Sequence, residues 1–320
     1  METKLNRKLQ LDFENVTTLF LAYPESVVDC GTDYTAAKAV FDRIIRALPS
    51  NINLIIFAKT ARIRRNLEKM RKKRTTVLVN SELSTIWLRD TAGFNMGTHI
   101  VKPIYRPKYY RKYYDEADKI DNYMKIIHSL LGIDMEPLPL IWDGGNLVSN
   151  GEVGFITEQI LIDNKKTHSE KEIKDIIKAS LDIDPVFVPV HSDDPFGHSD
   201  GFMSFLNKET LAVASYPKTW RRKERNYLQE LKTKAKRHVK NVIEIRENPA
   251  EEMNGSIYSA KGSYVNFLKL GKIILIPSFQ DKETERYNYS LLKQFGKVVP
   301  INCNELAKFG GLLHCISFTN

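Results

Sequence analysis

Residues 18–57 read TLFLAYPESVVDCGTDYTAAKAVFDRIIRALPSNINLIIF, and the hydrophobic pattern of this stretch indicates the class of fold. It opens with one short apolar run, 18–23, and closes with another, 52–57, and both are typical of buried strands. Between them, apolar residues recur at the spacing of one helix face from Ala37 to Leu48. A strand, a helix with one buried stripe and a second strand together predict an α/β protein.

The same alternation continues to the end of the chain, and it ordinarily indicates βαβ units in a parallel sheet. A further helix is expected from Ser169, because Ser169 and Glu172 form an S-x-x-E capping box. No linker rich in Pro, Gly or Ser interrupts the pattern, so we predict a single domain over 1–320, with 1–15 as a flexible segment. Strands are expected at 76–79, 186–190, 210–214, 242–245, 264–267, 272–276 and 297–299, and other helices at about 60–72, 116–131, 222–238 and 283–295.

Composition excludes several classes of protein. Hydrophobic residues make up 42% of the 320 residues and charged residues 27%, which excludes disordered, collagen-like and coiled-coil chains. The first fourteen residues lack the apolar core of a secretory signal, and no stretch reaches about 18 apolar residues. Three scattered cysteines cannot form a disulfide framework. We therefore expect a cytoplasmic protein with no membrane span.

The chain carries a net charge of +9, concentrated in two runs, 105–114 and 220–240. Such an excess raises the question of a nucleic-acid partner. Runs of this kind more often mark a solvated helix face or loop, so we do not expect nucleic acid to be bound. Neither G-x-G-x-x-G nor G-x-x-x-x-G-K-[ST] occurs, which removes the main support for a nucleotide site.

Chemically suggestive residues are concentrated in four short motifs that lie far apart in the sequence. Taken alone each motif is weak, because Asp-Gly-Gly is usually a turn and a buried Cys usually packs as a small apolar residue. The four are Trp87-Leu-Arg-Asp90, Trp142-Asp143-Gly-Gly-Asn146, Gly197-His198-Ser-Asp200-Gly201 and Gly310-Gly-Leu-Leu-His314-Cys315.

In this order, the motifs W-x-R-D, D-G-G-N, G-H-x-D-G and G-G-x-x-H-C resemble the agmatine deiminase family, which also contains the bacterial peptidylarginine deiminases. The resemblance runs from about residue 16 to the C-terminus, and 264–267 with 274–277 looks like the family's penultimate strand pair. It implies the pentein fold, a five-bladed αβ propeller with a central site. It also implies a hydrolase of C–N bonds in linear amidines, which produces a ureido compound and ammonia through a covalent Cys-amidino intermediate. Citrullination and polyamine metabolism are the settings of such enzymes.

The chemistry of a guanidinium agrees with this resemblance. A planar cation with five N–H donors needs carboxylates in its plane, and Asp90 and Asp200 are suitable, with Asp143 as a third. Its central carbon is a poor electrophile, so attack calls for a thiolate, for which Cys315 is the candidate. His198 would give a proton to the departing nitrogen and later take one from water. Because the thiolate replaces a metal-bound hydroxide, we expect no metal and no cofactor.

Supporting roles are assigned to the neighbours of these groups. Trp87 is expected to line the substrate pocket, and the resemblance adds Asn266. Arg89 is expected to brace nearby carboxylates. If Cys315 ended a strand, His314 would point to the opposite face and have a structural role. Cys30 and Cys303 have no motif around them and are expected to pack in the core as small apolar residues.

The sequence leaves the guanidino substrate open. Arg106-Pro-Lys108 resembles the Arg-Pro-Arg segment with which peptidylarginine enzymes hold a substrate carboxylate, although a surface loop is an equal explanation. We place agmatine first, and free arginine or a C-terminal peptidyl-arginine next. Amidino transfer to an amine and a non-catalytic RNA- or ribosome-binding pentein are the alternatives. A homodimer is also left open.

Overall fold

The computed structural model describes residues 8–320 except 72, 131, 193 and 256. The opening stretch folds as expected, into β1 (Thr18–Ala22), α1 (Lys38–Ala47) and β4 (Asn53–Ala58). The two strands pair in parallel, and α1 buries the stripe that contains Phe41 and Ile44. The protein is therefore α/β, as its periodicity predicted.

Five sheets of the described chain share one pairing pattern, in which a central strand has one antiparallel neighbour and one parallel neighbour. In each of these sheets a helical connection joins the parallel pair, so the βαβ units that the alternation indicates are present. They do not form one parallel sheet, because the chain divides into small mixed sheets. The sheets are β20 (Ser317–Thr319), β1, β4 and β5 (Thr75–Val79); β6 (Phe94–Asn95), β7 (His99–Ile104) and β8 (Asp134–Ile141); β9 (Val148–Ser149), β10 (Val153–Thr157) and β11 (Asp184–Val188); β12 (Met203–Asn207), β13 (Thr210–Ser215) and β14 (Asn241–Arg246); and β17 (Leu268–Leu270), β18 (Ile273–Ser278) and β19 (Lys297–Asn302).

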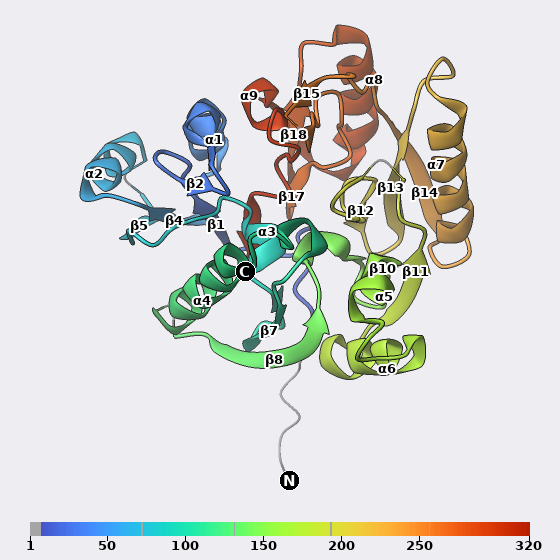
Figure 1. Ribbon diagram of the computed structural model, residues 1–320. Helices are drawn as coiled ribbons and strands as arrows, with labels where there is room; N and C mark the ends of the chain where they lie inside the picture. Colours follow the sequence, from blue (N-terminus) through green and yellow to red (C-terminus); the bar gives the residue numbers. More distant parts are fainter. Residues whose placement is uncertain (1–7, 72, 131, 193, 256) are drawn as a thin grey trace.

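Figure 1 shows the five sheets following one another in chain order around the middle of the molecule, where the short helix α3 (Leu88–Thr91) lies. The longer helices stand on the outside. The buried apolar residues form clusters that join neighbouring sheets: one cluster connects β1 and β4 to β17 and β19, and another connects β10 to β13 and β18. The other helices are α2 (Ala61–Met70), α4 (Tyr114–Leu130), α5 (Gln159–Asn164), α6 (Glu170–Leu181), α7 (Arg222–Ala235), α8 (Lys282–Leu292) and α9 (Asn304–Ala307); two small hairpins are β2 (Val28–Asp29) with β3 (Thr32–Asp33) and β15 (Met253–Asn254) with β16 (Ile257–Tyr258).

Two local predictions had different outcomes. The capping box is confirmed, since the Ser169 hydroxyl accepts from the Glu172 N–H and the Glu172 carboxylate accepts from the Ser169 N–H. The strand expected at 264–267 is wrong, because these residues form a loop before β17. The N–H groups of Tyr264 and Val265 donate to the buried Glu247 carboxylate at 2.8 and 2.9 Å, so they are not available to a strand partner.

The two ends of the described chain meet beside α3. β20 is the antiparallel partner of β1, with Phe318 opposite Phe20 and their ring centroids 5.5 Å apart. This pairing brings the turn that contains Cys315 to the middle of the molecule. Of the segment 1–15 that we expected to be flexible, residues 1–7 lie outside the described residues, and 8–15 bury Leu9 and Leu11.

None of the helices in the described part of the chain combines the length and the apolar character that crossing a bilayer requires.

Phe318→Ala should lower the free energy of unfolding by about 3 to 5 kcal/mol, because the ring is 6% exposed and its removal leaves a cavity against Phe20. Urea denaturation measures the change. Met253→Ala, at a side chain that is 55% exposed, is the control and should shift it by less than about 0.5 kcal/mol. Equal effects of the two substitutions would contradict this account of how β20 is held.

Candidate active site

The four motifs meet where the sheets surround α3. Asp90 lies on α3, Asp143 and Gly145 follow β8, His198 and Asp200 lie in the loop between β11 and β12, and Cys315 precedes β20. Backbone hydrogen bonds tie the motifs together. The Asp200 N–H donates to the Gly145 carbonyl at 3.1 Å, the Arg89 N–H to the Cys315 carbonyl at 3.1 Å, and the Gly145 N–H to Asp90 Oδ1 at 3.1 Å.

Paired glycines allow this close approach. A Cβ on Gly144 would lie 1.9 Å from the Arg89 carbonyl oxygen, and one on Gly145 would lie 2.5 Å from Asp90 Oδ1. A Cβ on Gly311 would lie 2.4 Å from the Trp87 ring. The Asp-Gly-Gly and Gly-Gly segments therefore serve packing between motifs as well as turn formation.

His198 is held between two carboxylates. Its Nε2 lies 3.0 Å from Asp143 Oδ2, and its Nδ1 lies 3.6 Å from Asp90 Oδ1. Burial alone would lower the pKa of the imidazole, but the charges of Asp90 and Asp143 outweigh it and raise the pKa of His198 to about 10. The Tyr109 hydroxyl also donates to Asp143 Oδ2, at 2.8 Å. The imidazole is therefore protonated at neutral pH in the empty site.

Asp90 and Asp200 are both buried, at 8% and 3% exposure, but their charges are compensated differently. Burial raises the pKa of Asp90 to about 7, with further contributions from the Asp143 and Asp200 charges. Burial also acts to raise the pKa of Asp200, but the hydrogen bond and charge of His314 outweigh it and the pKa is lowered. Of the two, only Asp90 is disfavoured in its charged form.

Cys315 is the partly exposed thiol of the site. Its Sγ lies 3.5 Å from Asn266 Oδ1 and 3.8 Å from Asp200 Oδ2. Burial and the charges of Asp200 and Asp90 raise the pKa of the thiol well above its ordinary value. A positive charge placed against these carboxylates would lower that pKa again.

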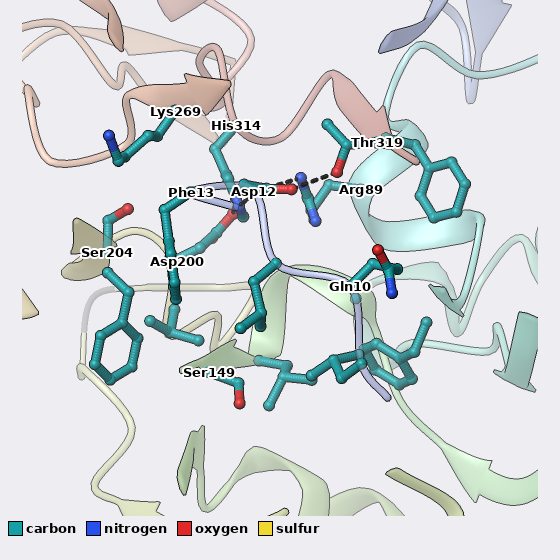
Figure 2. A pocket seen from close by; sticks show the side chains of 18 of the residues that line it. Gln10, Asp12, Phe13, Arg89, Ser149, Asp200, Ser204, Lys269, His314 and Thr319 are labelled. Carbon is teal, nitrogen blue, oxygen red and sulfur yellow. Dashed lines mark hydrogen bonds and ion pairs between the residues drawn. The ribbon is translucent and has the colours of Figure 1, made fainter. Parts of the chain in front are cut away.

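His314 does not lie on a strand, so the alternation that we invoked does not apply to it. It lies in the turn before β20 with Cys315, and its Nδ1 is 2.7 Å from Asp200 Oδ2. Its Nε2 is 3.1 Å from Asp12 Oδ2, which also accepts from Arg89 Nη2 at 2.8 Å. Figure 2 shows these four side chains together beside a small cavity of about 80 Å³. His314 therefore supports the charge of Asp200, and Arg89 braces a carboxylate as expected.

Two larger cavities meet at the thiol. One of about 390 Å³ and one of about 220 Å³ share Phe196, His198 and Cys315. Asp90 and Trp87 line the first, and Asp200 and Asn266 line the second. A guanidinium at the junction would therefore have Asp90 on one side and Asp200 on the other.

The basic residues of the 105–114 run do not line either cavity. Arg106 is exposed, pairs with Asp118 at 3.2 Å and stacks on Tyr114. Lys108 lies at a separate, small cavity beside Asp143. Four tyrosines of this run do line the larger cavity, together with Tyr34: Tyr105, Tyr109, Tyr110 and Tyr113. The charge of the run points to its Arg and Lys residues, whereas the tyrosines repeated in YRPKYYRKYY are the signal for the residues that reach the cavity.

No group of three or more His, Cys, Asp and Glu that could hold a metal ion is found in the part of the chain that the structure describes. That the protein works without a metal stays a prediction.

Comparison with known proteins gives the family. A family model described as Porphyromonas-type peptidyl-arginine deiminase matches residues 8–320. The chain belongs to this family. A Photobacterium profundum protein, provisionally named an agmatine deiminase, is 23% identical over 97% of this chain and 94% of its own. An agmatine deiminase of Ectopseudomonas mendocina is 26% identical over 55% of this chain and 56% of its own.

Solved structures give the fold. The C. jejuni agmatine deiminase superposes with a TM-score of 0.81 over 98% of this chain and 95% of its own, at 15% identity. The Enterococcus faecalis agmatine deiminase gives a TM-score of 0.78 over 98% and 96%, at 17% identity. The fold of the chain is that of the pentein superfamily. Family membership also gives the enzyme class, a hydrolase of C–N bonds in guanidino or amidine compounds.

Asp143→Asn should lower the pKa of His198 from about 10, because one of the two carboxylates that raise it loses its charge. The imidazole can be followed by NMR through a pH titration. Asp163→Asn is a matched control, since Asp163 lines the same small cavity but bonds to Gln159 and does not contact His198. An imidazole pKa that does not change in Asp143→Asn would contradict the proposed charge balance.

Proposed function

We propose that the protein hydrolyses the guanidino group of agmatine, or of an arginine-type compound, to a ureido product and ammonia. The observation that carries this proposal is the junction of the two cavities. There the Cys315 thiol, the protonated His198 and the carboxylates of Asp90 and Asp200 surround one space, and Asp143 Oδ2 lies 3.0 Å from His198 Nε2. A buried site with more carboxylates than cations is suited to a cationic substrate.

Binding places the guanidinium between Asp90 and Asp200. Each carboxylate accepts hydrogen bonds from N–H groups in the plane of the cation. The positive charge of the substrate neutralises Asp90, whose own charge the protein compensates only in part. The same charge lowers the pKa of Cys315, because the thiolate now has a cation beside it. The nucleophile is therefore activated by the substrate that it attacks.

The chemical step then proceeds in two halves. The Cys315 thiolate forms an S–C bond to the central carbon, and the C–N bond to the leaving nitrogen breaks as His198 gives that nitrogen a proton, which releases ammonia. Neutral His198 next takes a proton from water, which attacks the same carbon. The S–C bond breaks and the thiolate is regenerated. The added hydroxyl loses its proton to solvent, and the carbon becomes the carbonyl of the ureido product.

The comparisons support this proposal. A structure of the C. jejuni enzyme has substrate bound in a variant whose cysteine is replaced by serine. Five sheets with one pairing pattern support a five-bladed αβ propeller as the frame of the site. Agmatine is placed first because Arg106, which would hold a substrate carboxylate, pairs with Asp118 instead.

The alternatives predict different products. Amidino transfer would require an amine and would release no ammonia, whereas an RNA- or ribosome-binding protein would turn over no guanidine. Incubation with agmatine, arginine and a peptide ending in arginine, with and without added amine, separates these cases through measurements of ammonia and ureido product. A homodimer stays open, and the absence of bound nucleic acid stays a prediction.

Cys315→Ala should abolish turnover and leave the fold intact, because the thiol carries the covalent step and makes only weak contacts. Mass spectrometry of the acid-quenched enzyme should find the amidino adduct on Cys315. Cys303→Ala is the control and should retain turnover, since Cys303 is fully buried and its pKa is raised by that burial. An adduct on Cys303 would refute the assignment.

Asp90→Asn and Asp200→Asn should each lower kcat/KM by at least about a hundredfold, since each removes a buried partner of the guanidinium. Their stabilities should differ in sign. At pH 8, above the Asp90 pKa of about 7, Asp90→Asn relieves an unfavourable charge and raises the free energy of unfolding. Asp200→Asn lowers it, because folding favours the ionised form of Asp200. Urea denaturation measures the free energies of unfolding. A kcat/KM close to that of the parent protein in both variants would contradict the role of these aspartates in binding the guanidinium.

A further inference from the structure

A buried carboxylate with an unused oxygen lies in the larger cavity, away from the four motifs. Asp29 is 5% exposed and lines the 390 Å³ cavity that contains Cys315. The Tyr110 hydroxyl donates to its Oδ2. Its Oδ1 has no hydrogen-bond partner among the described residues. A buried polar atom of this kind calls for a ligand, because leaving it unpaired is costly.

The local backbone fixes Asp29 in this place. It ends β2, and the two-residue turn Cys30-Gly31 returns the chain into β3, where Thr32 pairs with Asp29. Both turn residues have positive φ, 47° and 82°, as a type I′ hairpin requires. The carboxylate is therefore presented by a short rigid hairpin.

The surroundings of Asp29 favour a cation. The residues that line this cavity include no Lys or Arg. They include five tyrosines: Tyr34, Tyr105, Tyr109, Tyr110 and Tyr113. Burial raises the pKa of Asp29, and the Tyr110 hydroxyl and the Cys30 thiol offset part of the rise, while the charge of Glu116 adds a smaller contribution to it. Aromatic faces attract a cation, and ammonium groups are commonly held in this way.

We propose that Asp29 and the tyrosines around it form a subsite for a second, distal ammonium group on the substrate. This inference rests on the proposed function and specifies its substrate class: guanidino compounds that end in a free ammonium and carry no carboxylate. The guanidinium lies at Cys315, the carbon chain follows the tyrosines, and the ammonium donates to Asp29 Oδ1. A substrate carboxylate in this cavity would face Asp29 and Asp90. The cation that lines the cavity, the protonated His198, is already held between Asp90 and Asp143.

The test compares agmatine with butylguanidine, which has the same carbon chain without the ammonium. The native enzyme should have a kcat/KM for agmatine at least about thirtyfold above that for butylguanidine, and also above that for arginine. Asp29→Asn should lower kcat/KM for agmatine by a similar factor and leave butylguanidine within about threefold. Asp33→Asn is the matched control, because Asp33 lies on the same hairpin with an exposed side chain and does not line the cavity.

Binding separates the subsite from the chemistry. Calorimetric titration of Cys315→Ala with agmatine and butylguanidine, with and without Asp29→Asn, needs no turnover. If agmatine binds more tightly than butylguanidine to Cys315→Ala, and equally to the double variant, the subsite is supported. This result holds even if the native enzyme hydrolyses no guanidine, because a lack of hydrolysis would refute only the proposed function. Equal dissociation constants for agmatine and butylguanidine in Cys315→Ala, which retains Asp29, would overturn the subsite. This comparison does not depend on the folding of any Asp29 variant.

Discussion

The structure depends on the burial of more negative charge than the protein itself neutralises. Asp90, Asp143 and Asp200 are each less than 9% exposed, and they share the imidazoles of His198 and His314. Asp200 has its own partner in His314. Asp90 shares His198 with Asp143 at a longer distance and takes on a raised pKa. One carboxylate is thus undercompensated beside the thiol, which suits a site that receives a planar cation.

Such a cluster can form only where several chain segments converge without side chains between them. The glycines after Asp143 and before His314 provide that approach, because a methyl group on either Gly145 or Gly311 would collide with the side chain of another motif. The pairing of β20 with β1 then places Cys315 in the middle of the molecule. The wide spacing of the motifs in the sequence is a consequence, since each comes from a different sector of the fold.

Local patterns predicted most of the elements, because the stripe of α1 and the capping box at Ser169 are signals within a few residues. The motifs identified the groups that the structure brings together. The sequence could not predict the sheet topology, because strand pairing is set by long-range contacts. It also could not predict that Asp12, within the segment assigned as flexible, contacts His314. Asp29 carried no motif at all, and only its burial in the cavity distinguishes it from a turn residue.

The charge balance also determines how the empty protein responds to pH. The pKa of Asp90 rises from 3.8 to about 7 on folding, so the folded state holds this proton more tightly and loses that advantage as the pH rises through 7. The pKa of His198 rises from 6.5 to about 10, so its contribution is complete below 6.5 and is lost as the pH approaches 10. Both effects lower the stability of the empty site at higher pH. In the proposed function a guanidinium would oppose the first effect, because it would place a cation beside ionised Asp90. Substrate binding and protonation of Asp90 would then compete for the same carboxylate, and the proposed site would be best prepared for its substrate above the pH at which Asp90 ionises and below that at which His198 loses its proton.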